Sequence, residues 1–353
     1  MAKLFFLGER SLKRLLESIE AAEVYASVRR ERSSEYCNVR QVPEAEVSLR
    51  QPRPSASPKS FLQPAKERVA VYSTAGTSAE ESCPMCGERA LVGLRGCDMK
   101  AMEYLDKVFR GGDFQDPFYD ARRNADILIT VDCVTPHEAC FCTALGGKPF
   151  AESGFDLNLT PIDSGYLLEV GSEKGQAILD KMGAEVSEAT PAQLKERETV
   201  RQKAVETLEK QNEGLRVTDK IREVLLSEVK PDAWSRAMAD CVECAACTFI
   251  CPTCHCFYLY DQTAGPEKFE RVRSWDSCIL GDYHRMAGPK GAKPSPRPGL
   301  VSRCANRVLH KYAFSPTQYG MLGCTGCGRC IEACFGKIDI RKVLKELGGG
   351  EDA

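Results

Sequence analysis

The sequence lacks the features that would place the chain in a membrane, outside the cell or on nucleic acid. No apolar run approaches the roughly 20 residues that a transmembrane helix needs. The short apolar run at residues 4–7 stops at Gly8 without a small-residue cleavage site, so we expect no secretory signal. Basic and acidic residues number 48 and 50, a formal net charge of −2, which excludes a global bias toward nucleic acid. We therefore expect a cytoplasmic protein with no membrane span and no nucleic-acid partner.

Signatures of organic cofactors are also missing. Gly93 and Gly96 follow a predicted strand but do not form the G-x-G-x-x-G pattern of a dinucleotide site. Only four histidines occur, and they are scattered: His137, His255, His284 and His310. The sequence therefore predicts no catalytic residue set, and no flavin or NAD(P)H site of its own.

Cysteine is the residue that the chain has in excess. It contains 19 cysteines among 353 residues. In a small secreted protein this number would indicate disulfides, but the chain is long and has no export signal. In a reducing compartment, clustered thiols are typical of metal ligands. We therefore interpret the cysteine clusters as metal sites.

The chain divides into five predicted segments. Residues 1–60 contain a helix starting after Ser11 and end in a Pro/Ser-rich extended connector. Residues 61–190 alternate strands with helices, which favours a mixed α/β domain. Residues 191–234 are predicted to form a charged helical bridge, 235–342 the cysteine-dense domain, and 343–353 a flexible tail. Strands are predicted at 69–72, 91–94, 127–131 and 166–170, and helices at 98–109, 173–182, 191–229 and 340–347.

Two short cysteine runs repeat the spacing of bacterial two-cluster ferredoxins. They are Cys241-x2-Cys244-x2-Cys247-x3-Cys251-Pro252 and Cys324-x2-Cys327-x2-Cys330-x3-Cys334. Two-residue gaps let a tight turn wrap one cubane with three thiolates, and small residues in the gaps permit close approach of the backbone. Phe335 stands where proline is usual, but no ligand is lost. The C-terminal domain is thus predicted to be ferredoxin-like, with a long insertion between its two runs.

The fourth cysteine of each run is predicted to bind the cluster of the other run, as in two-cluster ferredoxins. This rule assigns Cys241, Cys244, Cys247 and Cys334 to one [4Fe–4S] cluster, and Cys324, Cys327, Cys330 and Cys251 to a second. The alternative is a pair of zinc knuckles in a zinc-binding interaction module. Zinc sites usually take two C-x2-C pairs separated by a longer loop, so the spacing favours clusters.

The other cysteines leave alternatives open. Cys97, Cys133, Cys140 and Cys142 lie near predicted strand ends, so a third [4Fe–4S] cluster and buried structural thiols are competing hypotheses. Cys254, Cys256 and Cys278 are only three, and an additional site there would need Cys304 or His255 as a fourth ligand. Cys83 and Cys86 form an isolated pair whose role stays open, and Cys37 has no companion.

Longer motifs surround these cysteines. They are Cys-Pro-Thr-Cys-His-Cys-Phe at 251–257, Arg-Ser-Trp-Asp-Ser-Cys at 273–278, Gly-Cys-Thr-Gly-Cys-Gly-Arg-Cys at 323–330, and Tyr-Leu-Leu-Glu-Val-Gly-Ser-Glu-Lys-Gly at 166–175. The combination resembles the iron–sulfur β subunit of soluble sulfhydrogenases and is similar to the iron–sulfur electron-transfer subunit of anaerobic sulfite reductase. The likeness covers about residues 55–342.

The resemblance implies a protein that passes single electrons between two partners. One partner would be a flavoprotein subunit that binds FAD and NAD(P)H. The other would be a terminal catalytic subunit of the hydrogenase, sulfite reductase or heterodisulfide-reductase type. The alternative is an enzyme that does reductive chemistry at an unusual cluster of the α/β domain. The α/β region and a basic loop around Lys290 to Arg307 are the candidate docking faces.

Overall fold

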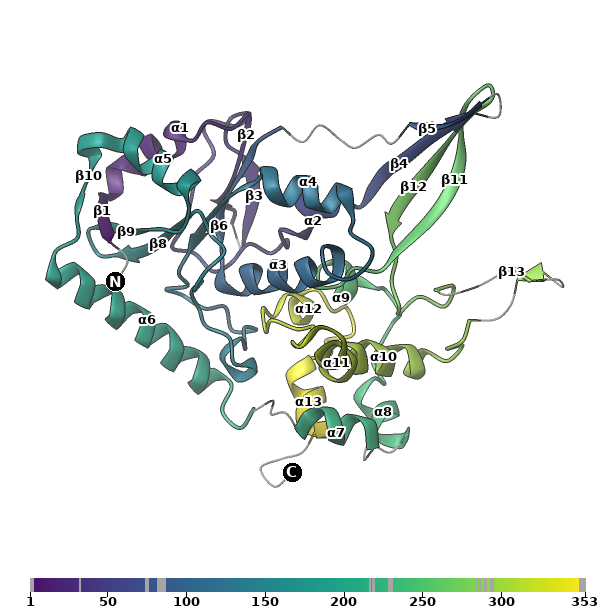
Figure 1. Cartoon of the computed structure of the whole chain (residues 1–353). Coiled ribbons are helices and arrows are strands. Elements are labelled where there is room, and N and C mark those ends of the chain that lie inside the picture. The colour runs from purple at the N-terminus through teal and green to yellow at the C-terminus, as the bar shows by residue number, and fades with distance from the viewer. Residues whose placement is uncertain are drawn as a thin grey trace.

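In a computed structural model, the chain is described for residues 3–31, 33–73, 76–80, 87–215, 217, 220–227, 231–283, 285, 287–288, 291–292 and 295–348. Within these residues the chain forms a large sheet flanked by helices, a second sheet that projects as an arm, and a helical C-terminal region (Figure 1). None of the described helices combines the length and the apolar character that a membrane span requires.

The large sheet has eight strands in the order β10-β1-β9-β8-β7-β6-β2-β3. The strands are β1 Leu4–Gly8, β2 Glu23–Arg29, β3 Ser34–Asn38, β6 Arg89–Leu94, β7 Ile127–Val131, β8 Leu157–Ile162, β9 Gly165–Val170 and β10 Val186–Glu188. The pairs β2–β6, β6–β7 and β7–β8 are parallel, whereas the other neighbours are antiparallel. The mixed α/β prediction for this half of the chain is confirmed.

Helices cover both faces of this sheet because its central strands are apolar on both sides. Ala90 and Val92 of β6 belong to a core that also contains α1 (Leu12–Ser18) and α5 (Glu173–Met182). Leu91, between them, packs with α3 (Gly96–Phe109) and α4 (Pro117–Ala125) in a second core. Side chains alternate along a strand, so neighbouring residues serve opposite layers.

The second sheet joins strands from distant parts of the sequence. Its order is β11-β12-β4-β5, with β4 Lys66–Ser73, β5 Gly76–Glu80, β11 Phe257–Gly265 and β12 Lys268–Trp275, and all neighbours are antiparallel. It projects from the body in Figure 1. The strand predicted at 69–72 exists, but it pairs with β12 rather than joining the α/β sheet. A short apolar run indicates a strand without identifying its partner.

The C-terminal helices share a core of their own. The helices are α7 Lys220–Ser227, α8 Pro231–Ala237, α9 Ala246–Phe249, α10 Leu300–Leu309, the π-helical η4 His310–Phe314, α11 Ser315–Tyr319, α12 Arg329–Glu332 and α13 Ile340–Gly348. Trp234, Val308, Tyr312 and Leu344 lie in this core, together with Phe141 of the α/β region. The long α6, Pro191–Gln211, runs between the sheet and these helices (Figure 1). The remaining elements are α2 Lys59–Leu62, β13 Ala287–Gly288, β14 Gly291–Ala292 and the 3-10 turns Glu9–Ser11, Thr143–Leu145 and Gly183–Glu185.

Several segments differ from the sequence-based expectation. The helix predicted at 191–229 is instead two helices, α6, which ends at Gln211, and α7, which begins at Lys220. Residues 1–60 contribute the strands β1, β2 and β3 besides the expected helix, and β1 pairs with β9 and β10. The segment 281–303, expected to be a loop, ends in the first residues of α10. The final helix reaches Gly348, within the segment expected to be a tail, and residues 349–353 lie outside the described residues.

Candidate metal centre

The two cysteine runs fold in the same way, as their repeated spacing suggests. Glu243 and Ala245 of the first run have φ of 57° and 58°, and Gly326 and Gly328, at the equivalent places of the second run, have φ of 65° and 73°. Within each run a short helix begins directly after the second of these residues: α9 after Ala245 and α12 after Gly328. A left-handed conformation costs a non-glycine residue about 1–2 kcal/mol, and such strain is characteristic of functional sites.

Glycine is needed in the second run because another loop packs against it. A Cβ atom on Gly326 would lie 2.6 Å from the Cα of Cys142, and one on Gly328 would lie 2.3 Å from the carbonyl oxygen of Ala139. The backbone N–H of Phe141 donates to the carbonyl oxygen of Gly326 at 2.7 Å. The second run is therefore packed directly against the cysteine-containing loop of the α/β region.

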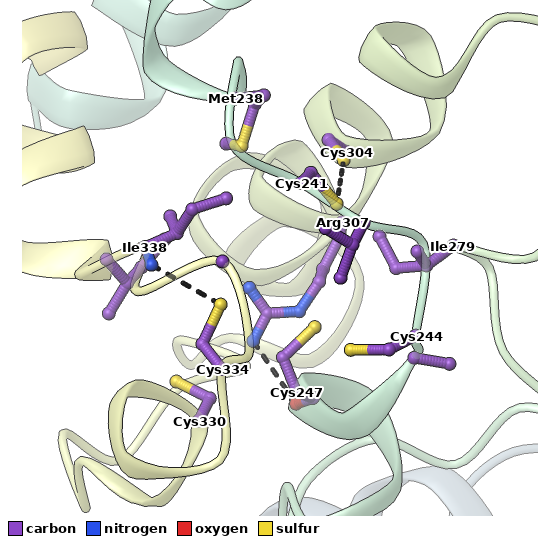
Figure 2. Close-up of a pocket in the computed structure, with 14 residues that line it drawn as sticks. Met238, Cys241, Cys244, Cys247, Ile279, Cys304, Arg307, Cys330, Cys334 and Ile338 are labelled. Atoms are coloured by element: carbon purple, nitrogen blue, oxygen red, sulfur yellow. Dashed lines mark hydrogen bonds between the residues drawn. The ribbon is translucent and has the colours of Figure 1, made fainter.

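Cysteines of both runs line a cavity that we name cavity 1. Its cysteines are Cys241, Cys244, Cys247, Cys304, Cys330 and Cys334, and Met238, Val242, Ile279 and Arg307 also contribute to its wall. Figure 2 shows the sulfur atoms of Cys244, Cys247 and Cys334 around the Arg307 guanidinium. Cys334 comes from the second run, whereas its three companions in the predicted ligand set come from the first. The four cysteines that the crossed rule groups together therefore meet at one cavity.

A second cavity, cavity 2, lies beside the first. It is lined by Cys251, Cys324, Cys327 and Cys330, together with Arg307, Lys311 and Tyr312. Here Cys251 of the first run meets three cysteines of the second, which is the other predicted set. Cys330 and Arg307 line both cavities, so cavities 1 and 2 are immediate neighbours.

A third cavity, cavity 3, lies between the α/β region and the second cysteine run. It is lined by Cys97, Cys133, Cys140, Cys142 and Cys327, along with Arg53, His137 and Gly326. Cys97 lies in the first turn of α3, after β6, and Cys133 follows β7. Because β6 and β7 are parallel neighbours, their carboxyl ends bring these thiols to one edge of the sheet. Cys327 also lines cavity 2, so the three cavities form a continuous series.

The remaining cysteines make contacts of other kinds, and the additional site at Cys254, Cys256 and Cys278 stays a prediction. Cys256 shares a hydrogen bond with Cys278 and accepts another from the Tyr283 hydroxyl at 3.3 Å. Cys254 instead pairs with Cys251. The two candidate fourth ligands are engaged elsewhere: Cys304 donates to Cys241 Sγ at 3.5 Å, and the His255 ring packs against Tyr104, Phe109 and His310. Cys37 is half-buried in β3, and Cys83 and Cys86 lie outside the described residues.

Burial disfavours the ionised form of several of the cavity thiols. It raises the pKa of the Cys133 and Cys330 thiols to about 12. A bound metal supplies the positive charge that lets such a thiol ionise. Among the described residues, no three His, Cys, Asp or Glu side chains converge as ligands of a single metal ion. The thiols are spread around the walls of the cavities instead, an arrangement that suits a cluster of several iron atoms.

Buried cations lie at these cavities where the sequence predicts an exposed basic docking loop. Arg303 and Arg307 belong to that loop and Lys311 follows it, yet all three are at most 8% exposed; Lys290 and Lys293 of the loop lie outside the described residues. Burial by itself would lower the pKa of Lys311, but electrostatic attraction to the neighbouring sulfur atoms, that of Cys251 first, raises it well above its usual value. The spacing of four residues between these cations, which places them on one helix face, is the signal in the sequence that could have indicated their burial.

Two further arginines connect the second run to the N-terminal half. The Arg329 guanidinium binds Asp98 of α3, with NH1 2.6 Å from Oδ1, and both side chains are fully buried. Arg53 donates to the carbonyl oxygen of Cys327 and to the Glu332 carboxylate. These contacts hold cavities 2 and 3 in fixed positions relative to one another.

Comparison with known proteins defines the class of this centre. Residues 240–338 match the family model for a 4Fe-4S dicluster domain, and that segment contains both cysteine runs. The C-terminal region is therefore a domain of the class that holds two [4Fe–4S] clusters.

The whole chain has a relative of similar length. Over 336 residues it is 31% identical to sulfhydrogenase 2 subunit beta of Pyrococcus furiosus, and the match covers 94% of this chain and 94% of that protein. The chain belongs to the sulfhydrogenase β-subunit family. The resemblance noted in the sequence is thereby confirmed.

Proposed function

We propose that this chain is the iron–sulfur subunit of an oxidoreductase complex. It would pass single electrons from a partner that binds flavin and NAD(P)H to a terminal catalytic subunit, or in the reverse direction. The observation that carries the proposal is the series of three cysteine-lined cavities joined through Cys330 and Cys327. A chain of adjacent redox centres moves electrons without itself converting a substrate. The catalytic partner would be of the hydrogenase, sulfite reductase or heterodisulfide-reductase type.

The proposed ligands follow the walls of the cavities. Cavity 1 would use Cys241, Cys244, Cys247 and Cys334, cavity 2 would use Cys251, Cys324, Cys327 and Cys330, and cavity 3 would use Cys97, Cys133, Cys140 and Cys142. Residues 235–342 then act as one ferredoxin-like unit, with the segment between the runs as an insertion and residues 191–234 as a helical bridge to the α/β region. A [4Fe–4S] cluster, when bound, would accept and release one electron at a time.

The flavoprotein partner is inferred from the chemistry of the electron donor. NAD(P)H delivers a hydride, which carries two electrons, whereas a cubane takes one, so a flavin must divide the pair. The chain has no dinucleotide fingerprint that would hold such a flavin. We therefore assign the flavin to a partner protein.

Cavity 1 is the proposed point of electron exchange with a partner. Cys244 is exposed, Val242 beside it is 61% exposed, and Phe335, next to Cys334, is 77% exposed. In contrast, Cys97, Cys140 and Cys142 of cavity 3 and Cys251 and Cys327 of cavity 2 are buried. Exposed apolar side chains next to a redox centre are suited to a protein interface.

The test compares cluster reduction with and without the flavoprotein. The chain alone should be reduced by dithionite but not by NAD(P)H, and it should not oxidise NAD(P)H with artificial dyes. Addition of the flavoprotein should allow NAD(P)H to reduce the clusters. Rapid, stoichiometric reduction by NAD(P)H with this chain alone would refute the proposal and favour an enzyme that acts at a cluster of its own.

The site of exchange can be tested in the same assay. Phe335→Asp should slow reduction through a partner that docks at cavity 1 while leaving reduction by dithionite unchanged. Phe114→Asp is the matched control, because Phe114 is also an exposed phenylalanine, at 91%, but lies between α3 and α4. If both substitutions slow the partner equally, cavity 1 is not the docking point.

A further inference from the structure

Two buried cations lie one helical turn apart between the proposed cluster sites. Arg307 is in α10 and Lys311 is in η4, and they are 8% and 5% exposed. Residues four apart on a helix lie on the same face, so both side chains point in a similar direction. Arg307 lines cavities 1 and 2, whereas Lys311 lines cavity 2.

The contacts of Lys311 use all the donors of its ammonium group. Nζ donates to Cys251 Sγ at 3.3 Å, to Thr253 Oγ1 at 2.9 Å and to the carbonyl oxygen of Gly323 at 2.8 Å. An ammonium group has three N–H donors and no acceptor, so these contacts satisfy it fully. One of the three is a sulfur atom that we propose as a cluster ligand.

Arg307 is less completely satisfied. Its NH2 donates to the carbonyl oxygen of Cys247 at 3.3 Å, and its buried Nε has no hydrogen-bond partner. Figure 2 shows its guanidinium among the sulfur atoms of cavity 1. A buried donor without a partner costs free energy unless something at the site accepts from it or compensates its charge.

Neither cation has a carboxylate partner among the described residues, unlike the other buried arginines nearby. Arg303 binds Glu243, Arg329 binds Asp98 and Arg53 binds Glu332. Burying an unpaired charge is strongly unfavourable, so a negative group is expected close to both side chains. A [4Fe–4S] core with four thiolates carries net negative charge, and reduction adds one more.

We propose that Arg307 and Lys311 tune the reduction potentials of the two ferredoxin-type clusters, an inference that rests on the ligand sets proposed above. Their positive charges stabilise the more negative, reduced state and thereby raise the reduction potential. Lys311 acts on the cavity 2 cluster, and Arg307 acts on the clusters of both cavities. With two buried cations beside it, neither of which has a carboxylate partner in the described part of the chain, the cavity 2 cluster has a higher potential than the cavity 1 cluster, so it holds the electron in the middle of the series.

The test is an EPR-monitored redox titration of the full holo-protein, with iron and sulfide measured on each sample. Lys311→Met should lower the reduction potential of the cavity 2 cluster by at least about 59 mV. For a one-electron couple, this shift changes the ratio of oxidised to reduced cluster tenfold. Arg307→Gln should lower the potentials of both clusters. Lys311→Arg, which keeps the charge, should restore most of the wild-type potential, and Lys203→Met, which removes an exposed lysine of α6, should change neither.

The outcomes separate this inference from the proposal on which it rests. Wild-type protein without iron and sulfide contradicts the clusters themselves. Full iron content with unchanged potentials in Lys311→Met and Arg307→Gln overturns the tuning role alone. If Lys311→Met loses its clusters, Lys311→Gln is titrated in its place, because its amide can still donate to Thr253. In the redox titration, the transition that belongs to the cavity 1 cluster is identified as the one that Cys244→Ser alters.

Discussion

The ion pair between Arg329 and Asp98 allows a quantitative test of how the two halves of the molecule are joined. Both side chains are fully buried, with NH1–Oδ1 and NH2–Oδ2 distances of 2.6 and 3.4 Å. Asp98 follows Cys97 of cavity 3, and Arg329 precedes Cys330 of cavity 2. Arg329→Met would leave the buried carboxylate with the backbone N–H of Arg95 as its remaining donor. Removing one partner of a buried pair costs about 3–5 kcal/mol.

Native-state hydrogen exchange measures this loss without requiring reversible unfolding of a metalloprotein. Amides of α3 and of residues 324–334 should lose protection by roughly 100-fold or more, because each 1.4 kcal/mol corresponds to a factor of ten. Net stabilities are typically about 5–15 kcal/mol, so this loss is a large fraction of the total.

The matched control is Arg271→Met. Arg271 makes a bidentate contact with Asp261, at 2.8 and 2.9 Å, but the two side chains are 51% and 40% exposed. Solvent screens an exposed pair and leaves it little net stabilisation, so protection in β11 and β12 should fall by less than roughly tenfold. If the two substitutions reduce protection to the same extent, burial is not what makes the Arg329–Asp98 pair important, and the reasoning is wrong.

Three further substitutions test the site. Gly328→Ala should cause a loss of iron from cavities 2 and 3, because the added Cβ would lie 2.3 Å from the Ala139 carbonyl oxygen. The control is Gly320→Ala, at a similar φ of 69° but with open space around the added Cβ. It should keep the full iron content and lower the free energy of unfolding by about 1–2 kcal/mol. Cys327→Ser should remove the cavity 2 cluster and perturb the EPR signals of its neighbours, whereas intact spectra would exclude Cys327 as a ligand. Cys133→Ser should reduce the iron content by about four per chain if cavity 3 holds a cubane. Unchanged iron content would instead make Cys133 a structural thiol.

The two proposed ligand sets of the cysteine runs can be derived from the sequence because cluster spacing is local. Each run places three thiols within seven residues, and the fourth follows a fixed rule, so the eight cysteines from Cys241 to Cys334 that form the two runs could be grouped by spacing alone. Cavity 3 was a weaker prediction, because Cys97 and Cys133 meet only through the parallel pairing of β6 with β7.

The burial of the two cations and the strand pairing of the second sheet could not be predicted from local spacing. Burial of Arg307 and Lys311 depends on helices that pack around them, and a basic stretch is by default expected to face solvent. The partner of β4 could not be predicted for the same reason: its short apolar run fits the α/β sheet and β12 equally well, and β12 lies about two hundred residues away. Tertiary packing, rather than local sequence, decided both.

One measurement shows most directly what the three cavities hold. Iron, acid-labile sulfide and zinc should be determined on full-length protein purified under strictly anaerobic conditions, with Mössbauer spectra to identify the iron. We predict about twelve iron and twelve sulfide per chain, all in cubane clusters, because three such clusters fit the three sets of four cysteines. A result of about eight iron and eight sulfide would support the two clusters of the dicluster domain and exclude a cluster in cavity 3. Stoichiometric zinc with little sulfide would contradict the central claim.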